Sequence, residues 1–104
     1  MTIQINTDKT ISGEKRTEDF FTSQIEEALE RFESHITRVE VHLKDENGKK
    51  DGFNDISCLL EARLEGRQPI AVTNQADTID LALTGAIDKI KNAVESILGK
   101  IQKH

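Results

Sequence analysis

The sequence predicts an α+β fold in the order β-α-β-β-β-α, a four-stranded mixed sheet with two helices packed on one face. Two observations support this. In three short segments apolar residues alternate with polar ones, which is typical of half-buried strands, and a short run after Pro69 is predicted to form the fourth strand. In two longer segments apolar residues recur every three or four positions, which is typical of amphipathic helices. A chain of 104 residues has room for a single domain, residues 1–104, around one core.

The first strand and the first helix come first in the chain. Between Thr2 and Thr7 the apolar side chains of Ile3 and Ile5 point to one side, as in a short strand. From about Glu14 the period becomes helical. The apolar stripe of this helix consists of Phe21, Ile25, Ala28, Leu29 and Phe32. A right-handed crossover through this helix would make the first two strands parallel.

Three further strands are predicted over residues 36–44, 55–65 and 70–73. Their inward side chains are Val39, Val41, Leu43, Ile56, Cys58, Leu60, Ala62 and Leu64. An Asn47-Gly48 turn signal indicates a long hairpin connection between the first two of these strands. Gly66-Arg67 predicts a two-residue turn in which glycine takes a positive φ. Pro69 cannot donate to a ladder, so it predicts that the last strand lies at an edge.

The final helix is expected to begin near Asn74 and Asp77 and to run to about Lys103. Its apolar stripe is Ile79, Leu83, Ala86, Ile90, Ala93, Val94, Ile97 and Ile101. Each helix has one apolar face, so both should pack on the same side of the sheet. The other sheet face carries Gln4, Arg38, Glu40, His42, Glu61, Arg63 and Glu65. We expect this face to be exposed and crossed by ion pairs between strands.

The composition argues against several classes of function, among them nucleic-acid binding by the molecule as a whole. The net charge of −5 means that the molecule as a whole does not attract nucleic acid or anionic lipid, so any polyanion must bind a local basic patch. The chain has no Trp or Tyr and four Phe, which argues against a base-stacking surface. A single cysteine cannot form an internal disulfide, which suits a reducing compartment. With no signal peptide and no apolar run of membrane-spanning length, the chain is expected to be soluble and cytoplasmic.

No catalytic or metal-binding constellation is visible. The three histidines are scattered, and His42 is expected to be a solvated strand residue. Cys58 is expected to be a buried structural thiol, because no basic group flanks it on the inward face. The loop from Asp45 to Gly52 resembles a calcium loop only superficially, since lysines interrupt its oxygen ligands. We therefore expect no enzyme activity, no cofactor and no metal.

The last helix carries a candidate basic strip. At about 100° per residue, one flank of its apolar stripe consists of Lys89, Asn92, Ser96, Lys100 and Lys103. This flank has no acidic residue and could follow a run of phosphates. The alternative is an ordinary solvated face with lysines near the helix C-terminus, where they suit the helix dipole. Weaker candidates of the same kind, near the hairpin ends, are Arg63, Arg67, Lys49 and Lys50.

The order of elements in so short a chain resembles the ribosome hibernation-promoting factors and ribosome-associated inhibitors, also called sigma-54 modulation proteins. The residues that carry the resemblance are Ile3-Gln4-Ile5-Asn6, Arg31-Phe32, the strand over residues 36–43, and Ala86-Ile87-Asp88-Lys89-Ile90. Residues 60–72, from Leu60 to Val72, resemble a short, single-domain branch of that family. No single motif identifies the family, so the resemblance rests on the order of the elements together with the length of the chain.

The resemblance implies a fold like that of double-stranded-RNA-binding domains. It also implies a stress factor that binds the small ribosomal subunit, through rRNA and ribosomal proteins, and modulates or silences translation. No DNA or membrane partner is expected. The alternative is an acidic protein-interaction module with the same fold that has lost rRNA binding, because the first helix is rich in glutamate. A second copy could then add across the Pro69 edge strand.

Overall fold

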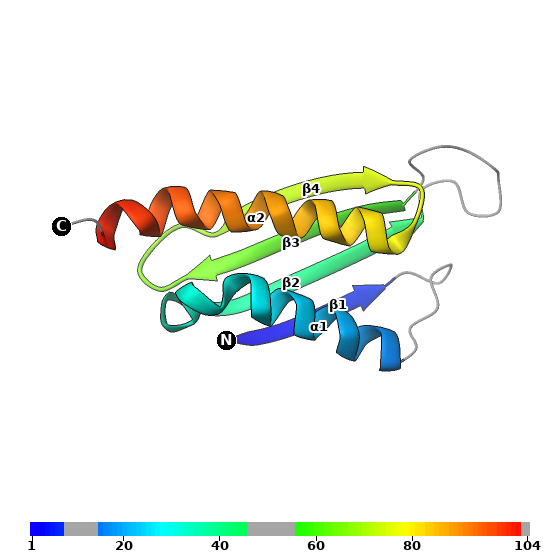
Figure 1. Ribbon diagram of the computed structural model, residues 1–104, viewed down its shortest axis with the longest axis horizontal. Coiled ribbons are helices and arrows are strands. Elements are labelled where there is room, and N and C mark those ends of the chain that lie inside the picture. The colour runs from blue at the N-terminus through cyan, green and yellow to red at the C-terminus, as the bar shows by residue number, and fades with distance from the viewer. Residues whose placement is uncertain (8–14, 46–55, 103–104) are drawn as a thin grey trace.

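The computed structural model describes residues 1–7, 15–45 and 56–102 (Figure 1). Its elements are β1 Thr2–Thr7, α1 Lys15–Leu29, a 3₁₀ helix η1 Glu30–His35, β2 Ile36–Asp45, β3 Ile56–Leu64, β4 Ile70–Ala76 and α2 Ile79–Gln102. The predicted α+β order β-α-β-β-β-α is confirmed. The Asn47-Gly48 turn and most of the loop from Asp45 to Gly52 lie outside the described residues.

The four strands form one mixed sheet in the order β1-β2-β3-β4. The β1 and β2 strands are parallel, as expected for strands joined by a helical crossover, and Ile3 is paired with Val39. The β2, β3 and β4 strands follow as antiparallel neighbours. Both helices lie over the same face of this sheet, α1 over β1 and β2 and α2 over β3 and β4 (Figure 1).

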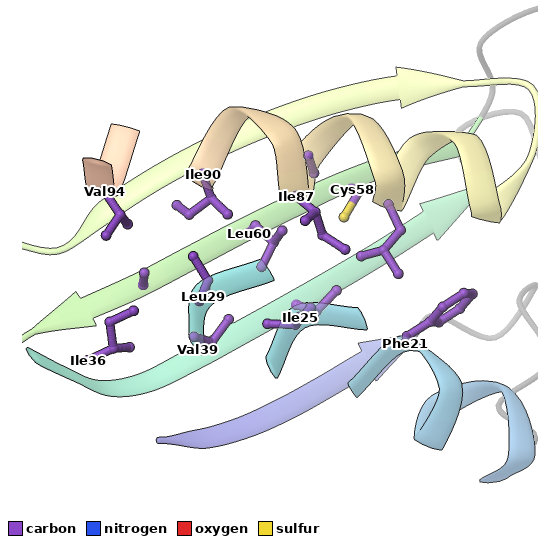
Figure 2. Close-up of a cluster of buried hydrophobic side chains, with 14 of the residues drawn as sticks. Phe21, Ile25, Leu29, Ile36, Val39, Cys58, Leu60, Ile87, Ile90 and Val94 are labelled. Carbon is purple, nitrogen blue, oxygen red and sulfur yellow. The ribbon is translucent and has the colours of Figure 1, made fainter. Parts of the chain in front are cut away.

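The core fills the layer between the helices and the covered sheet face (Figure 2). From α1 and η1 it receives Phe21, Ile25, Leu29 and Phe32; from β2 and β3, Ile36, Val39, Val41, Leu43, Cys58, Leu60, Ala62 and Leu64; and from α2, Ala82, Leu83, Ala86, Ile87, Ile90, Val94 and Leu98. The alternation along β2 and β3 therefore points the predicted side chains inward. No described polar or charged residue is fully buried.

The end of β4 and the start of α2 differ from the expectation. The β4 strand runs to Ala76 rather than Thr73, and Asn74 is a ladder residue paired with Cys58. The expectation that Asn74 lies at the helix N-terminus is wrong. Thr78 takes that role, because its Oγ1 accepts a hydrogen bond from the backbone N–H of Leu81 at 3.2 Å.

The connection between β3 and β4 also differs in part. Gly66 has a φ of +72°, as predicted, and a non-glycine residue would be strained there. The connection is longer than the predicted two-residue turn, because β3 ends at Leu64 and β4 begins at Ile70. Pro69 has no N–H to donate, and pairing with β3 begins at the next residue, where Ile70 meets Ala62.

Candidate nucleic-acid interface

The basic flank of α2 faces the outer edge of the sheet. Lys89 is exposed, and its Nζ donates a hydrogen bond to the main-chain oxygen of Thr73 in β4 at 2.7 Å. Asn92 and Ser96, which share this flank, are also exposed. Lys100 belongs to α2, but its side chain is outside the description, and Lys103 lies beyond the described residues. The part of the strip that can be placed therefore runs beside β4, on the side of α2 away from α1.

The opposite flank of α2 faces α1. A shallow hollow of ≈ 360 Å³ between the two helices is lined by Gln24, Glu27, Ala28, Thr84, Ile87 and Lys91. Beside it, Arg31 Nη1 lies 3.4 Å from Glu95 Oε1 and joins η1 to α2. The hollow thus brings Lys91 near Glu27, and charges of both signs meet there. Lys91 is not among the candidates from the sequence, and only the packing of α2 against α1 shows its position.

Arg63 lies on the open face of the sheet, away from the helices. Its Nε is 3.2 Å from Glu61 Oε1 and its Nη2 is 3.7 Å from Glu40 Oε2. Arg38 Nη2 is 3.3 Å from the other oxygen of Glu40 and also donates to the side-chain oxygen of Gln4. The Arg63–Glu40 pair joins β3 to β2, as predicted, whereas the Arg38–Glu40 and Arg63–Glu61 pairs each lie within one strand.

The Arg63–Glu40 pair runs diagonally between β3 and β2. Directly opposite residues carry like charges, since Arg38 is paired with Arg63 and Glu40 with Glu61. Like charges directly opposite destabilise a sheet, and each arginine is offset by a carboxylate on its own strand or diagonally across. Arg63 shares its guanidinium between two glutamates, so its charge is largely committed within the sheet.

The remaining candidate cations are Arg67, Lys49 and Lys50. Arg67 is exposed in the connection between β3 and β4. Lys49 and Lys50 fall outside the described residues, in the connection between Asp45 and Ile56, which pair with each other at the opposite end of the sheet. Of the three candidates with described side chains, Lys89 lies at the β4 edge, Arg63 on the open face and Arg67 in a turn. They do not form one compact patch.

Chemistry-bearing side chains are few in the described part of the chain. Cys58 is fully buried, as predicted, and burial raises the pKa of its thiol to about 12, so it stays protonated near neutral pH. Among residues 1–7, 15–45 and 56–102, no three His, Cys, Asp or Glu side chains gather as a metal site. None of the helices in these ranges is long and apolar enough to cross a membrane.

An acidic surface covers the outer side of the first helical segment. Glu26, Glu27, Glu30 and Glu33 are exposed on α1 and η1. Together with Met1 and Ser23 they line a shallow hollow of ≈ 300 Å³. We call these four residues the acidic surface. It would repel a polyanion and attract a basic partner.

Comparison with known protein families shows to which family the chain belongs. The model of the family described as sigma 54 modulation protein / S30EA ribosomal protein matches residues 9–102. The chain belongs to this family. Its resemblance to the family, based on the order of its elements and on short motifs, is thereby confirmed. No curated protein sequence matches the chain.

Solved structures share the family fold. The crystal structure of the Thermus thermophilus Protein Y N-terminal domain superposes with a TM-score of 0.75 and 14% sequence identity, covering 93% of this chain and 99% of that one. A ribosomal subunit interface protein from Coxiella burnetii gives a TM-score of 0.70 at 12% identity, covering 95% and 99%. At such identities the likeness establishes the fold. The arrangement of strands and helices is therefore kept while most side chains differ.

Proposed function

We propose that this protein is a non-enzymatic, cytoplasmic, ribosome-associated stress factor that binds the small ribosomal subunit and modulates or silences translation. The observation that carries the proposal is the family match over residues 9–102. That family takes its name in part from a ribosomal protein, and one structural relative is a ribosomal subunit interface protein. The fold shared with that relative gives the proposal further support.

The strip beside β4 is our candidate for contact with rRNA. Lys89 would leave the Thr73 oxygen and donate to a phosphate, with Asn92 and Ser96 as neutral hydrogen-bonding neighbours. Lys100 and Lys103 would extend the strip toward the C-terminus. Additional phosphate contacts are proposed for Arg67, Lys49, Lys50 and Arg63. Arg63 is the weakest of them, because it must first part from Glu40 and Glu61.

Sedimentation tests ribosome association directly. Lysate of stationary-phase cells that express the protein is run through a sucrose gradient at low salt. We expect the protein in the small-subunit and ribosome fractions, and we expect its amount there to fall as salt rises, because phosphate contacts release counterions. A protein that stays at the top of the gradient at low salt would show that the proposal is wrong.

Charge reversal tests the strip. The double variant Lys89→Glu with Lys100→Glu should abolish association with ribosomes. A matched comparison uses two single variants that change the net charge equally: Lys89→Glu beside β4 and Lys91→Glu in the hollow between the helices. The first should weaken binding and the second should have a much smaller effect. Unchanged binding by the double variant refutes the strip, and equal losses in the two single variants point to total charge instead.

A second candidate function is a protein-interaction module that has lost rRNA binding. The acidic surface on α1 and η1 favours it, since four exposed glutamates would attract a basic protein such as a ribosomal protein. Pull-down before and after nuclease treatment separates the candidates. Partners that disappear with RNA support rRNA binding. Partners that survive nuclease and are lost in a variant with Glu26→Gln and Glu30→Gln support the interaction module.

A further inference from the structure

Within residues 1–7, 15–45 and 56–102, the outer edge of the β4 strand is unpaired. This strand is the last in the sheet order and pairs with β3 alone. Successive residues of a strand point their N–H and C=O groups to opposite sides. The Thr73 oxygen accepts a bond from Lys89, so it points away from β3. The main-chain groups of Ala71 and Gln75, two residues away on either side, point the same way and form the rest of the free edge.

The side chains along this edge give little protection against strand pairing. Those of Ala71, Thr73 and Gln75 are exposed and carry no charge. Proteins commonly protect an edge with a proline, a bulge or a charged residue, lysine above all. Pro69 stands just before β4 and not within it. Within the described residues, the charge at the middle of this edge is supplied from another element, by Lys89 of α2.

The position of Lys89 matters because the edge is self-complementary. An antiparallel pairing of β4 with β4 of a second copy, centred on Thr73, would be two-fold symmetric and would pair the outward groups of all three residues. It would also require the Thr73 oxygen that Lys89 now occupies. The two Lys89 ammonium groups would meet at the symmetry axis, where like charges repel and lose water.

We propose that Lys89 guards the β4 edge: its ammonium group holds the Thr73 oxygen and prevents β4 from pairing with β4 of a second copy. Loss of that charge opens the edge, and two chains then join their sheets through an antiparallel β4–β4 ladder. The surface is the edge from Ala71 to Gln75, and the partner is a second copy of this chain. The inference does not depend on ribosome binding.

The variant Lys89→Met tests the guard, because methionine keeps an unbranched apolar side chain but loses the ammonium group. Sedimentation velocity over increasing protein concentration should show the wild type as a monomer and Lys89→Met moving to twice the mass. The control Lys91→Met removes the same charge from the flank that faces α1 and should stay monomeric. Lys89→Arg keeps a cation at the edge and should also stay monomeric.

A second substitution locates the contact. The N–H of Thr73 points away from β3, so Thr73→Pro in the Lys89→Met background leaves the ladder within the chain intact and removes a donor at the centre of the new one. This double variant should return to a monomer. In the Lys89→Met dimer, the amide protons of Ala71, Thr73 and Gln75 should exchange more slowly than in the wild-type monomer.

Several outcomes would overturn the inference. Lys89→Met that remains a monomer at every concentration shows that Lys89 does not restrain pairing. A dimer that persists in the double variant, or that forms equally in Lys91→Met, shows that contact lies elsewhere or follows total charge. A wild type that already pairs through β4 shows that Lys89 is no barrier. Thermal unfolding of each variant tests whether it is folded. The Lys89 variants are expected to fold because Lys89 is exposed.

Discussion

At the scale of single residues, Asn74 and Gly85 form a matched pair that joins the sheet to α2. The side-chain Nδ2 of Asn74 donates to the main-chain oxygens of Leu81 at 3.3 Å and Ala82 at 3.1 Å. A Cβ on Gly85 would lie 2.1 Å from that Nδ2, far inside contact distance. Glycine within a helix costs about 0.5–1 kcal/mol relative to alanine. At position 85 the missing side chain leaves space for the amide of Asn74, which connects β4 to the first turns of α2.

The pair makes the effect of Gly85→Ala depend on Asn74. In the wild type the new methyl group should displace the amide and lower the free energy of unfolding by about 1 kcal/mol, since hydrogen bonds of about 1 kcal/mol each are lost. In an Asn74→Ala background, Gly85→Ala should instead raise the free energy of unfolding by roughly 0.5–1 kcal/mol through helix propensity. Urea unfolding of the four proteins measures this cycle. The same sign in both backgrounds would contradict the proposed contact.

At the scale of elements, α2 begins with a specific cap. Thr78 precedes the helix, its Oγ1 accepts from the Leu81 N–H, and its main-chain oxygen accepts from the Ala82 N–H at 3.0 Å. Asp80 adds a negative charge in the first turn, where the helix dipole favours it. The helix therefore begins after β4 has ended at Ala76, and β4 can extend along β3 as far as Ile56.

Removal of this cap should destabilise the protein without changing its fold. Thr78→Ala should lower the free energy of unfolding by about 1 kcal/mol, because one N–H at the helix start loses its acceptor. Thr78→Ser keeps the hydroxyl and should stay within a few tenths of a kcal/mol of the wild type. Thermal unfolding followed by circular dichroism makes the comparison. Equal losses in the two variants would mean that the methyl group, and not the hydroxyl, matters at this position.

At the scale of the whole molecule, the architecture has one covered and one open sheet face. Both helices lie on the same side of the sheet (Figure 1). The other side of β1 to β4 carries polar side chains and the ion pairs around Glu40. Neighbouring residues of one strand therefore have very different surroundings. Leu60 is 0% exposed beneath the helices, whereas Leu59, on the open face, is 37% exposed.

Substitution of these two leucines tests how differently the covered and the open sheet face contribute to stability. Leu60→Ala should lower the free energy of unfolding by about 2–5 kcal/mol, because it leaves a cavity in the core. Leu59→Ala removes the same atoms from a partly solvated site, and its cost should be smaller, at roughly 1 kcal/mol or less. Chemical denaturation of both variants gives the difference. Similar losses would mean that the open face is covered in solution, for example by another molecule.

Much of the fold could be predicted from the sequence because the first three strands and both helices carry a clear period in their apolar residues. Val39 and Val41 alternate with charged neighbours, and Leu83 and Ile90 recur at helical spacing. The end of β4 was harder to predict. Asn74 has the chemistry of a helix cap, and only its contact with main-chain oxygens of α2 in three dimensions shows its other use.

Less of the candidate interface could be predicted. The angular spacing along α2 places Lys89 and Lys91 on different flanks. It does not say which flank faces α1 and which faces the edge of the sheet, because that depends on how α2 packs on β3 and β4. Arg63 was a candidate by charge alone, and its two carboxylate partners come from different strands. Its pairing with Glu40 of β2 is long-range and leaves no local pattern in the chain.

The weak burial of β1 has a consequence for how the native state fluctuates. None of its six residues is fully buried, and among the described strands it pairs only with β2. Release of β1 would leave the β2–β3 and β3–β4 ladders and the packing of α2 in place. Sub-global opening is expected where buried contacts are fewest. The protein should therefore behave as a cooperative unit of β2, β3, β4 and α2 to which the N-terminal strand is reversibly docked.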